Sequence, residues 1–295
     1  MKAKEKNTLK MAVDACMTIV LLCLMAYQVV GETLHEWGGV TMTVLLIVHH
    51  ILNRKWYAAV FKGRYNAQRI VSTAVNTLLV ISIVLTALSG MAMSAHAVPF
   101  LYGFLPVSFA RSTHLAMSYW SFILMGLHLG LHVPAMTSGI KLGSGAKKAA
   151  AALLAAIAGI GLWLFVRSGI PGYIFFKNPF AFFDYDKSAL LVYAENIAML
   201  IAFAFIGANC AFFMKAGAGS DGGRKKRRTF YAALVLAALI ICVLLSAFAG
   251  RSAEGSAQSS QPVQPAGSAE EKPSETTNEP SKAIDDGFVL LEGDL

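Results

Sequence analysis

Apolar residues run along the first 250 positions of the chain in long stretches that short polar segments interrupt. Seven of these stretches are long enough for an α-helix to cross a bilayer, which takes about 20 residues. They cover roughly residues 11–31, 36–53, 70–95, 113–133, 148–167, 188–214 and 229–250. Because no polar block large enough for a soluble domain separates them, the pattern predicts an all-α, polytopic membrane protein.

The composition agrees with this prediction, since 56 % of the residues are hydrophobic and only 14 % are charged. Lys and Arg indicate the orientation because they accumulate in cytoplasmic loops. With the N-terminus inside, 18 of the 25 Lys and Arg residues lie on the cytoplasmic side. We therefore expect a multi-pass protein of the cell (inner, cytoplasmic) membrane, with the N-terminus inside and the C-terminus outside. The basic run GRKKRR (223–228) lies between two spans, which favours contact with anionic lipid over a nucleic-acid partner.

The cysteines exclude several kinds of site. All four cysteines fall within apolar stretches, and the chain has no C-x-x-C and no C-x-x-C-H motif. This pattern argues against a disulfide framework, a structural zinc site and a covalently attached c-type haem.

The seven histidines all lie within the first 132 residues. Two pairs repeat one spacing, since His35 precedes His49 by 14 residues and His114 precedes His128 by 14 residues. Fourteen residues fall about 40° short of four helical turns and rise about 21 Å, so each pair lies on nearly one face of its helix at two depths. The second and fourth spans run parallel. We therefore expect His35 to face His114 at one depth and His49 to face His128 at the other.

Facing imidazoles inside a helix bundle are typical of axial ligands to haem iron. The spacing predicts two non-covalent b-type haems, with the metal ligands His35 and His114 at the outer site and His49 and His128 at the inner site. Because both axial positions are filled, such haems carry electrons and offer no open position to a substrate, so we expect no catalytic residue. Two haems at two depths would carry electrons across the membrane.

Other functions also fit intramembrane histidines. They could hydrogen-bond between helices as structural residues, as in a membrane transporter or an assembly factor without haem. They could also form a metal-ion or proton pathway. A quinol oxidoreductase with catalysis of its own is a further hypothesis, so whether the chain is an enzyme or only the electron-transfer component of an oxidoreductase system stays open.

Two further histidines leave the inner ligands ambiguous. His50 lies about 60° past the face of His35, and His132 lies one turn beyond His128 on the same face. We favour His49 and His128 as ligands, and we expect His50 and His132 to contact a haem propionate or a quinone. Arg111, near the outer end of the fourth span, is expected to pair with a propionate or to anchor the helix at the interface.

Several smaller features support or surround these sites. Glycines close to the ligand histidines would let a flat macrocycle approach the backbone, namely Gly38, Gly39, Gly126 and Gly130. Asp14 is expected near an interface or in a hydrogen bond between helices. His96 is expected to contact the outer site or, as we favour, to be an interfacial residue. The aromatic-rich loop 167–189 is expected either to cover the outer haem as a lid or to belong to an aromatic belt.

The chain divides into three regions on these grounds. Residues 1–135 form a four-helix haem-binding membrane module, and residues 136–250 form a three-helix membrane module without histidine. Residues 251–295 are rich in Ser, Pro, Gly and Glu, which predicts a disordered extracytoplasmic tail.

Four segments resemble the flavinylation-associated cytochromes, a family of di-haem b-type membrane cytochromes formerly known as a domain of unknown function. They are HEWGGV (35–40), HHILNRKWY (49–57), RSTHLAMSYWSFILMGLHLGLH (111–132) and FFKNPFAFFDYDKSALLVYAENIAML (175–200). The family pattern H-N-x-L-N-x-x-W places its histidine at His49 and leaves His50 where Asn is usual. The L-H-x-G-x-H stretch carries both His128 and His132, so the resemblance does not separate those two.

The resemblance implies electron transfer toward extracytoplasmic flavoproteins that carry covalently linked flavin mononucleotide. This chain has no D-x-x-[ST]-[GA]-A-T acceptor motif, so the flavin would belong to a partner. Because the chain has no nicotinamide- or flavin-binding domain, its electrons would come from a membrane quinol or a cytoplasmic reductase.

Overall fold

The computed structural model describes residues 3–63, 66–137, 139 and 143–216. This part of the chain is helical and contains no strand. Its long helices are α1 (Ala3–Met25), α2 (Tyr27–Leu52), α4 (Ala67–Met91), α5 (Val107–Met136), α6 (Ser144–Arg167) and α8 (Ala189–Ala216). Its short helices are α3 (Lys55–Val60), the 3-10 helix η1 (Pro99–Leu101) and α7 (Ile170–Ile174). The expected span 229–250 and the tail 251–295 lie outside the described residues.

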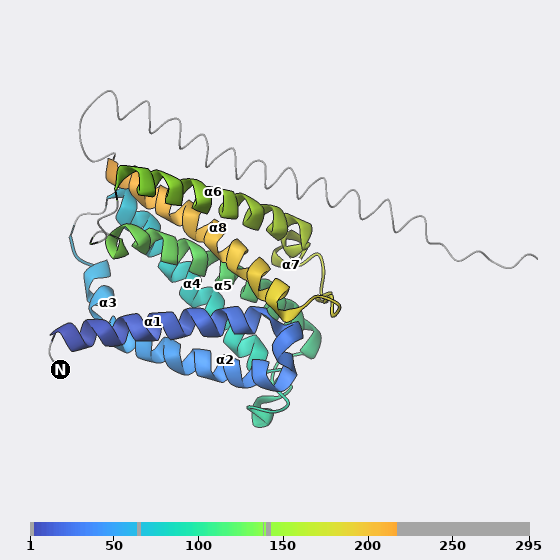
Figure 1. Ribbon diagram of the computed structural model, residues 1–295. Coiled ribbons are helices and arrows are strands. Elements are labelled where there is room, and N and C mark those ends of the chain that lie inside the picture. The colour runs from blue at the N-terminus through green and yellow to red at the C-terminus, as the bar shows by residue number, and fades with distance from the viewer. Residues whose placement is uncertain (1–2, 64–65, 138, 140–142, 217–295) are drawn as a thin grey trace, which may run out of the picture.

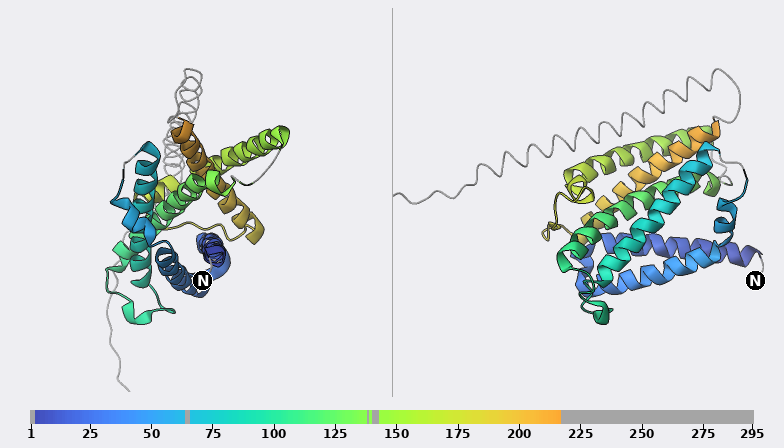
Figure 2. Two further views of the ribbon diagram at one scale, coloured as in Figure 1. Left: turned by 90° about the vertical axis from the view of Figure 1, so that its left-hand side faces the viewer. Right: turned by 180° about the vertical axis from the view of Figure 1, so that it is seen from behind.

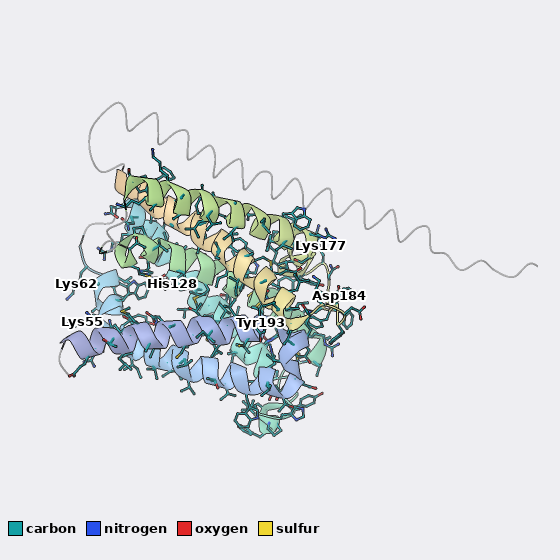
Figure 3. The ribbon with its side chains drawn as sticks, in the orientation of Figure 1. Lys55, Lys62, His128, Lys177, Asp184 and Tyr193 are labelled. Carbon is teal, nitrogen blue, oxygen red and sulfur yellow. The ribbon has the colours of Figure 1, made fainter. Side chains whose placement is uncertain are left out.

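The long helices run back and forth between two ends of the molecule (Figure 1). One end carries the segment 53–63, where Lys55 and Lys62 lie, and we call it the basic end (Figure 3). The opposite end carries the segments 92–106 and 168–188, and we call it the aromatic end. Many large aromatic side chains are exposed there, among them Phe100, Phe104, Phe175, Phe180 and Phe182.

Four of the long helices, α1, α4, α6 and α8, are long and apolar enough to cross a membrane. The described part of the chain is therefore that of a multi-pass membrane protein. The two long helices outside this group, α2 and α5, carry six of the seven histidines. Imidazoles, together with Glu36 on α2 and several hydroxyl groups on α5, lower the hydropathy of these two helices. The two helices that carry most of the histidines are thus less apolar than the four candidate spans.

The first turn of the fold differs from the expected span 11–31. Helix α1 ends at Met25, and α2 begins two residues later at Tyr27. The turn residue Ala26 is fully buried, so apolarity continues through the turn and hides it from the sequence pattern. Gly31 then adopts φ +74°, which L side chains avoid, and this residue kinks the start of α2.

The helices form three layers in Figure 1, with α6 and α8 on one side, α4 and α5 in the middle, and α1 and α2 on the other side. α5 packs closely along α4 and α8, and α6 packs along α8. α1 and α2 pack mainly on each other, and α2 meets α4 only sparsely. The end-on view of Figure 2 shows the α1–α2 hairpin set apart from the other helices. The histidines of α2 therefore face α4 and α5 across a loosely packed boundary.

Glycines bring α5 and α8 together. A Cβ at Gly130 would collide with the Ala204 carbonyl, and a Cβ at Gly207 would collide with the Leu127 carbonyl. A Cβ at Gly126 would lie 2.6 Å from Cβ of Phe203. The expectation that Gly126 and Gly130 admit a macrocycle beside His128 is therefore wrong, because small residues serve here to bring two helix backbones into contact.

Candidate functional site

His35 and His114 meet near the aromatic end, and we call them the aromatic-end pair. His35 comes from α2 and His114 from α5, and their ring centroids lie 5.9 Å apart with the planes at 75°. Two imidazoles on opposite sides of one metal would have their centroids about 6 Å apart, from metal–nitrogen bonds of about 2 Å. The structure thus brings together the two residues that the 14-residue spacing placed at one depth.

The backbone of α4 holds the ring of His114. Nδ1 of His114 donates to the carbonyl oxygen of Thr86 at 2.9 Å. One turn further along α4, a Cβ at Gly90 would lie 3.0 Å from Cε1 and 3.1 Å from Nδ1 of His114. Gly90 therefore provides the space that lets the ring approach the helix. Because Nδ1 carries the proton, Nε2 has a free lone pair for a metal or another donor.

His35 is held less firmly than His114. Its Nδ1 is buried, and although the backbone of Leu24 lies near, no described group makes a hydrogen bond of ordinary geometry with this atom. The edge of the Tyr27 ring packs against the imidazole, with centroids 5.1 Å apart. A buried polar atom without a partner is costly. His35 is thus the residue of the pair that has most to gain from a ligand.

The loop between α7 and α8 covers this end of α2. Phe183 stacks on Tyr27 with ring centroids 5.3 Å apart, and Gln28 Nε2 donates to the carbonyl oxygen of Asp184 at 3.1 Å. Tyr27 therefore lies between the loop and His35. The loop also exposes aromatic rings such as Phe180 and Phe182, and its role as a lid or as part of an aromatic belt stays a prediction.

Glu36 organises the loop after α4. Its carboxylate accepts hydrogen bonds from Ser94 Oγ at 2.7 Å and from the backbone amides of residues 95–97 at 2.8–3.0 Å. Ligand atoms of Glu32, Glu36 and His96 lie within 4.8 Å of one another. The Glu36 oxygens are already engaged by these donors, and the His96 side chain is exposed, as an interfacial residue would be.

At the basic end, His49 pairs with a carboxylate on the neighbouring helix. Its Nδ1 donates to Oδ1 of Asp14 on α1 at 2.7 Å. Asn53 Nδ2 donates to the His49 carbonyl at 3.0 Å and lies 3.5 Å from Nε2, while Lys10 Nζ donates to Asn53 Oδ1 at 2.8 Å. The expected hydrogen bond of Asp14 between helices is confirmed. As with His114, Nδ1 is engaged and Nε2 has no strong partner.

His128 follows the same pattern. Its Nδ1 donates to Oδ1 of Asn76 on α4 at 2.8 Å. The imidazole of His132 lies 4.7 Å away between centroids, and His49 is close enough to interact electrostatically with both rings. Figure 3 places His128 nearer to Lys55 and Lys62 than to Lys177 and Asp184, as expected for a ligand at the basic end.

The two ambiguous histidines are held differently from their neighbours. Nδ1 of His50 accepts from or donates to the Tyr57 hydroxyl at 2.7 Å, and its Nε2 is buried without a hydrogen-bond partner among the described residues. The ring of His50 lies edge-on to that of His49, with centroids 5.6 Å apart. His132 is exposed. All four imidazoles lie at the basic end. His49, His50 and His128 each have a hydrogen-bond partner at Nδ1, so this contact does not separate His49 from His50, and the choice of His49 and His128 as ligands stays a prediction.

Arg111 lies at the aromatic end, as its place in the sequence predicts. Its side chain is exposed, and its guanidinium lies 5.4 Å from the centre of the Phe180 ring. This cation–π contact ties the start of α5 to the loop after α7. The arrangement suits anchoring at an interface, and the pairing with a propionate stays a prediction.

Sequence reasoning missed two groups that hold the aromatic-end pair. Thr86 acts through its backbone carbonyl. Every residue has this group, so the residue type does not indicate the contact. Gly90 is one of 25 glycines, and only its approach to His114 distinguishes it. Asn76, which holds His128 from another helix, also has no local signal that links it to that histidine.

No family model, no curated protein and no solved structure matches the chain. The resemblance to the flavinylation-associated cytochromes therefore stays a prediction. The functional conclusion depends on the chemistry and placement of the histidines.

Proposed function

We propose that this protein carries electrons across a membrane through two non-covalent b-type haems, each held between two histidines. His35 and His114 would hold one haem near the aromatic end, and His49 and His128 would hold the other near the basic end. The observation that carries the proposal is the meeting of His35 and His114, 5.9 Å apart, from two helices that are otherwise separated.

The donor set fits haem iron. The iron needs a neutral imidazole with a free nitrogen on each side. His49, His114 and His128 each direct Nδ1 at an oxygen acceptor, which favours the tautomer with a free Nε2. A hydrogen bond to the other ring nitrogen is the usual companion of a metal-bound histidine. The loose boundary between the α1–α2 hairpin and α4–α5 separates the helices that would bind opposite faces of the macrocycle.

When bound, haem would supply a one-electron iron couple, and the histidine pairs would hold it without leaving a place for a substrate at the iron. The protein's own residues would hold the imidazoles in place and limit the access of water. Thr86 and Asn76 orient two of the rings from α4. Tyr27 packs against His35, and the loop residue Phe183 stacks on Tyr27. His50, His132 and Arg111 would contact propionates or a quinone at the edges.

The proposal places the chain in the cell membrane, with the basic end in the cytoplasm and the aromatic end outside. Electrons would enter from a membrane quinol or a cytoplasmic reductase and leave toward an extracytoplasmic flavoprotein or another acceptor. The resemblance to the flavinylation-associated cytochromes supports this direction. It also assigns the flavin to the partner.

A second function is a membrane transporter or assembly factor in which the histidines only join helices. The hydrogen bonds from His49 to Asp14 and from His128 to Asn76 support it, since each links neighbouring helices. Such a protein needs no prosthetic group. The two functions therefore differ in whether the purified protein absorbs visible light.

The test is the visible spectrum and haem content of the full chain, produced with ample haem and purified in detergent. We expect a dithionite-reduced α band typical of b-type haem and two haems per chain. His114→Ala should remove one haem, whereas the matched control His96→Ala, which changes a histidine outside both pairs, should retain two. A colourless wild-type protein would contradict the proposal and favour the transporter.

A further inference from the structure

Three of the four histidines that we assign as ligands have acceptors at their Nδ1 atoms, and these acceptors differ in charge. At the aromatic end, His114 donates to the neutral carbonyl of Thr86 at 2.9 Å. At the basic end, His128 donates to the neutral amide of Asn76 at 2.8 Å, whereas His49 donates to the carboxylate of Asp14 at 2.7 Å. The described part of the chain thus gives one end an ionisable acceptor in direct contact with the ring.

The Asp14 carboxylate has one hydrogen-bond partner among the described side chains, although His132 is close enough to interact with it electrostatically. It lies on α1 inside a helix apolar enough to cross the membrane, where a carboxylate is costly and commonly has a function. Lys10 lies one turn earlier, but its Nζ donates to Asn53 at 2.8 Å. Among the side chains that the structure describes, His49 is the one that hydrogen-bonds the Asp14 carboxylate.

A carboxylate at Nδ1 changes the chemistry of the opposite nitrogen. It accepts the Nδ1 proton in a short, charge-assisted hydrogen bond and makes Nε2 a stronger electron donor. A stronger donor with a negative charge behind it stabilises the more positive oxidation state of a metal. Hydrogen bonds to axial ligands are therefore one of the means by which a protein sets the potential of a haem.

We propose that Asp14 is a positioning residue that orients His49 and lowers the reduction potential of the basic-end site below that of the aromatic-end site. This inference rests on the proposed function. The asymmetry places the basic end upstream, since electrons move spontaneously from a lower to a higher potential. It provides a direction of flow, from the basic end to the aromatic end, that is independent of the family resemblance.

Glu36 is the acidic residue that could oppose this asymmetry, because it follows His35 directly. Its carboxylate, however, accepts hydrogen bonds from Ser94 and from three backbone amides. Those donors solvate the charge, and no hydrogen bond joins it to either ring of the aromatic-end pair. Its effect on that site is thus through space and weaker than that of a carboxylate bound to the ring.

The test is a spectroelectrochemical titration of the full chain in detergent, with each component assigned by loss of one haem in His49→Ala or His114→Ala. We expect the lower-potential component to be the one that His49→Ala removes. Asp14→Asn keeps the shape and an acceptor oxygen but removes the charge. It should shift the reduction equilibrium of that component about tenfold toward the reduced form, or about 59 mV for one electron. The aromatic-end component is the internal control and should not move.

If the Asp14→Asn protein does not retain the basic-end haem, a second variant tests the same electrostatic effect. Asn76→Asp replaces the neutral acceptor of His128 by a carboxylate of the same shape and should lower the potential of the basic-end component. Asp14→Glu should restore most of the wild-type potential. Two bound haems with the lower potential at the aromatic end, or an Asp14→Asn protein with both haems and unchanged potentials, would overturn the role of Asp14. Absence of haem from the wild type would overturn the proposed function instead.

Discussion

The two ends of this protein hold histidines in opposite ways. At the aromatic end, two imidazoles meet beneath an aromatic loop. The Thr86 carbonyl holds one of them, and Nδ1 of the other has no hydrogen bond of ordinary geometry among the described residues. At the basic end, four imidazoles gather, and side chains such as Asp14, Asn76 and Tyr57 hold three of them. Backbone and packing define the first site, whereas side-chain hydrogen bonds define the second. Point substitutions at the basic end should therefore act by removing hydrogen bonds to the imidazoles. Substitutions at the aromatic end should act by changing how the side chains pack.

The largest effect should come from removing a ligand of the basic end. Under the proposed function, His49→Ala should leave one haem per chain, because the basic-end site would lose one of its two histidines and the aromatic-end pair does not contact residue 49. His50→Ala is the matched control and should retain two haems, since the ring of His50 is held by Tyr57. Haem content per chain measures both. Loss of a haem from His50→Ala and not from His49→Ala would reverse the assignment.

Asn76→Ala should have the next largest effect, again at the basic end. Without its acceptor, the ring of His128 loses its orientation, and losses of this kind lower metal affinity about 10- to 100-fold. The measurement is haem retention by the basic-end component during dilution in detergent. Asn66→Ala is a control on the same helix, because Asn66 caps α4 by accepting from the Arg69 amide and is not part of the site. Equal haem loss from both variants would mean that α4 stability, and not the ring, is responsible.

Gly90→Ala should affect the aromatic end selectively. The added Cβ would lie about 3 Å from the imidazole of His114, so the ring must move away from α4 and lose part of its bond to Thr86. We expect the aromatic-end haem to bind about tenfold more weakly, which corresponds to the loss of a hydrogen bond of about 1.4 kcal/mol. Gly159→Ala on α6, where a Cβ meets nothing within 4 Å, should bind both haems normally. The effect is measured by titrating the haem-free protein with haem and determining the affinity of each of the two sites.

The smallest effect should follow Tyr27→Leu, which removes the aromatic contacts with His35 and Phe183. An aromatic pair contributes about 1 kcal/mol beyond its buried area. We therefore expect a modest loss in the thermal stability of the aromatic-end component and none at the basic end. Tyr102→Leu changes an exposed tyrosine elsewhere at the same end and serves as the control. An effect confined to the basic end would contradict the placement of the loop over His35.

Much of the fold could be predicted because hydrophobic periodicity is local. Six of the seven expected spans correspond to long helices, and the seventh lies outside the described residues. The spacing of His35 to His49 and of His114 to His128 also determined which histidines share a depth, since helical rise is the same in every helix. The turn at Ala26 was missed because a buried alanine has the same hydropathy in a turn as in a span.

The residues that hold the imidazoles could not be predicted, because they come from other helices. Asp14, Asn76 and Thr86 lie 35, 52 and 28 residues from the histidines that they hold. No local pattern specifies such pairs. The contacts of Gly126 and Gly130 could not be predicted for the same reason. Their proximity to His128 in the sequence favoured a place beside a cofactor, but in the fold they lie against α8.

The sequence alone thus determined a helical membrane protein with histidines at two depths, because helix formation and hydropathy depend on residues that are neighbours in the chain. Only the tertiary structure decided which side chain stands behind each imidazole, because helix packing joins distant segments. The difference between a carbonyl behind His114 and a carboxylate behind His49 is of the second kind. It is the difference from which the direction of electron flow is inferred.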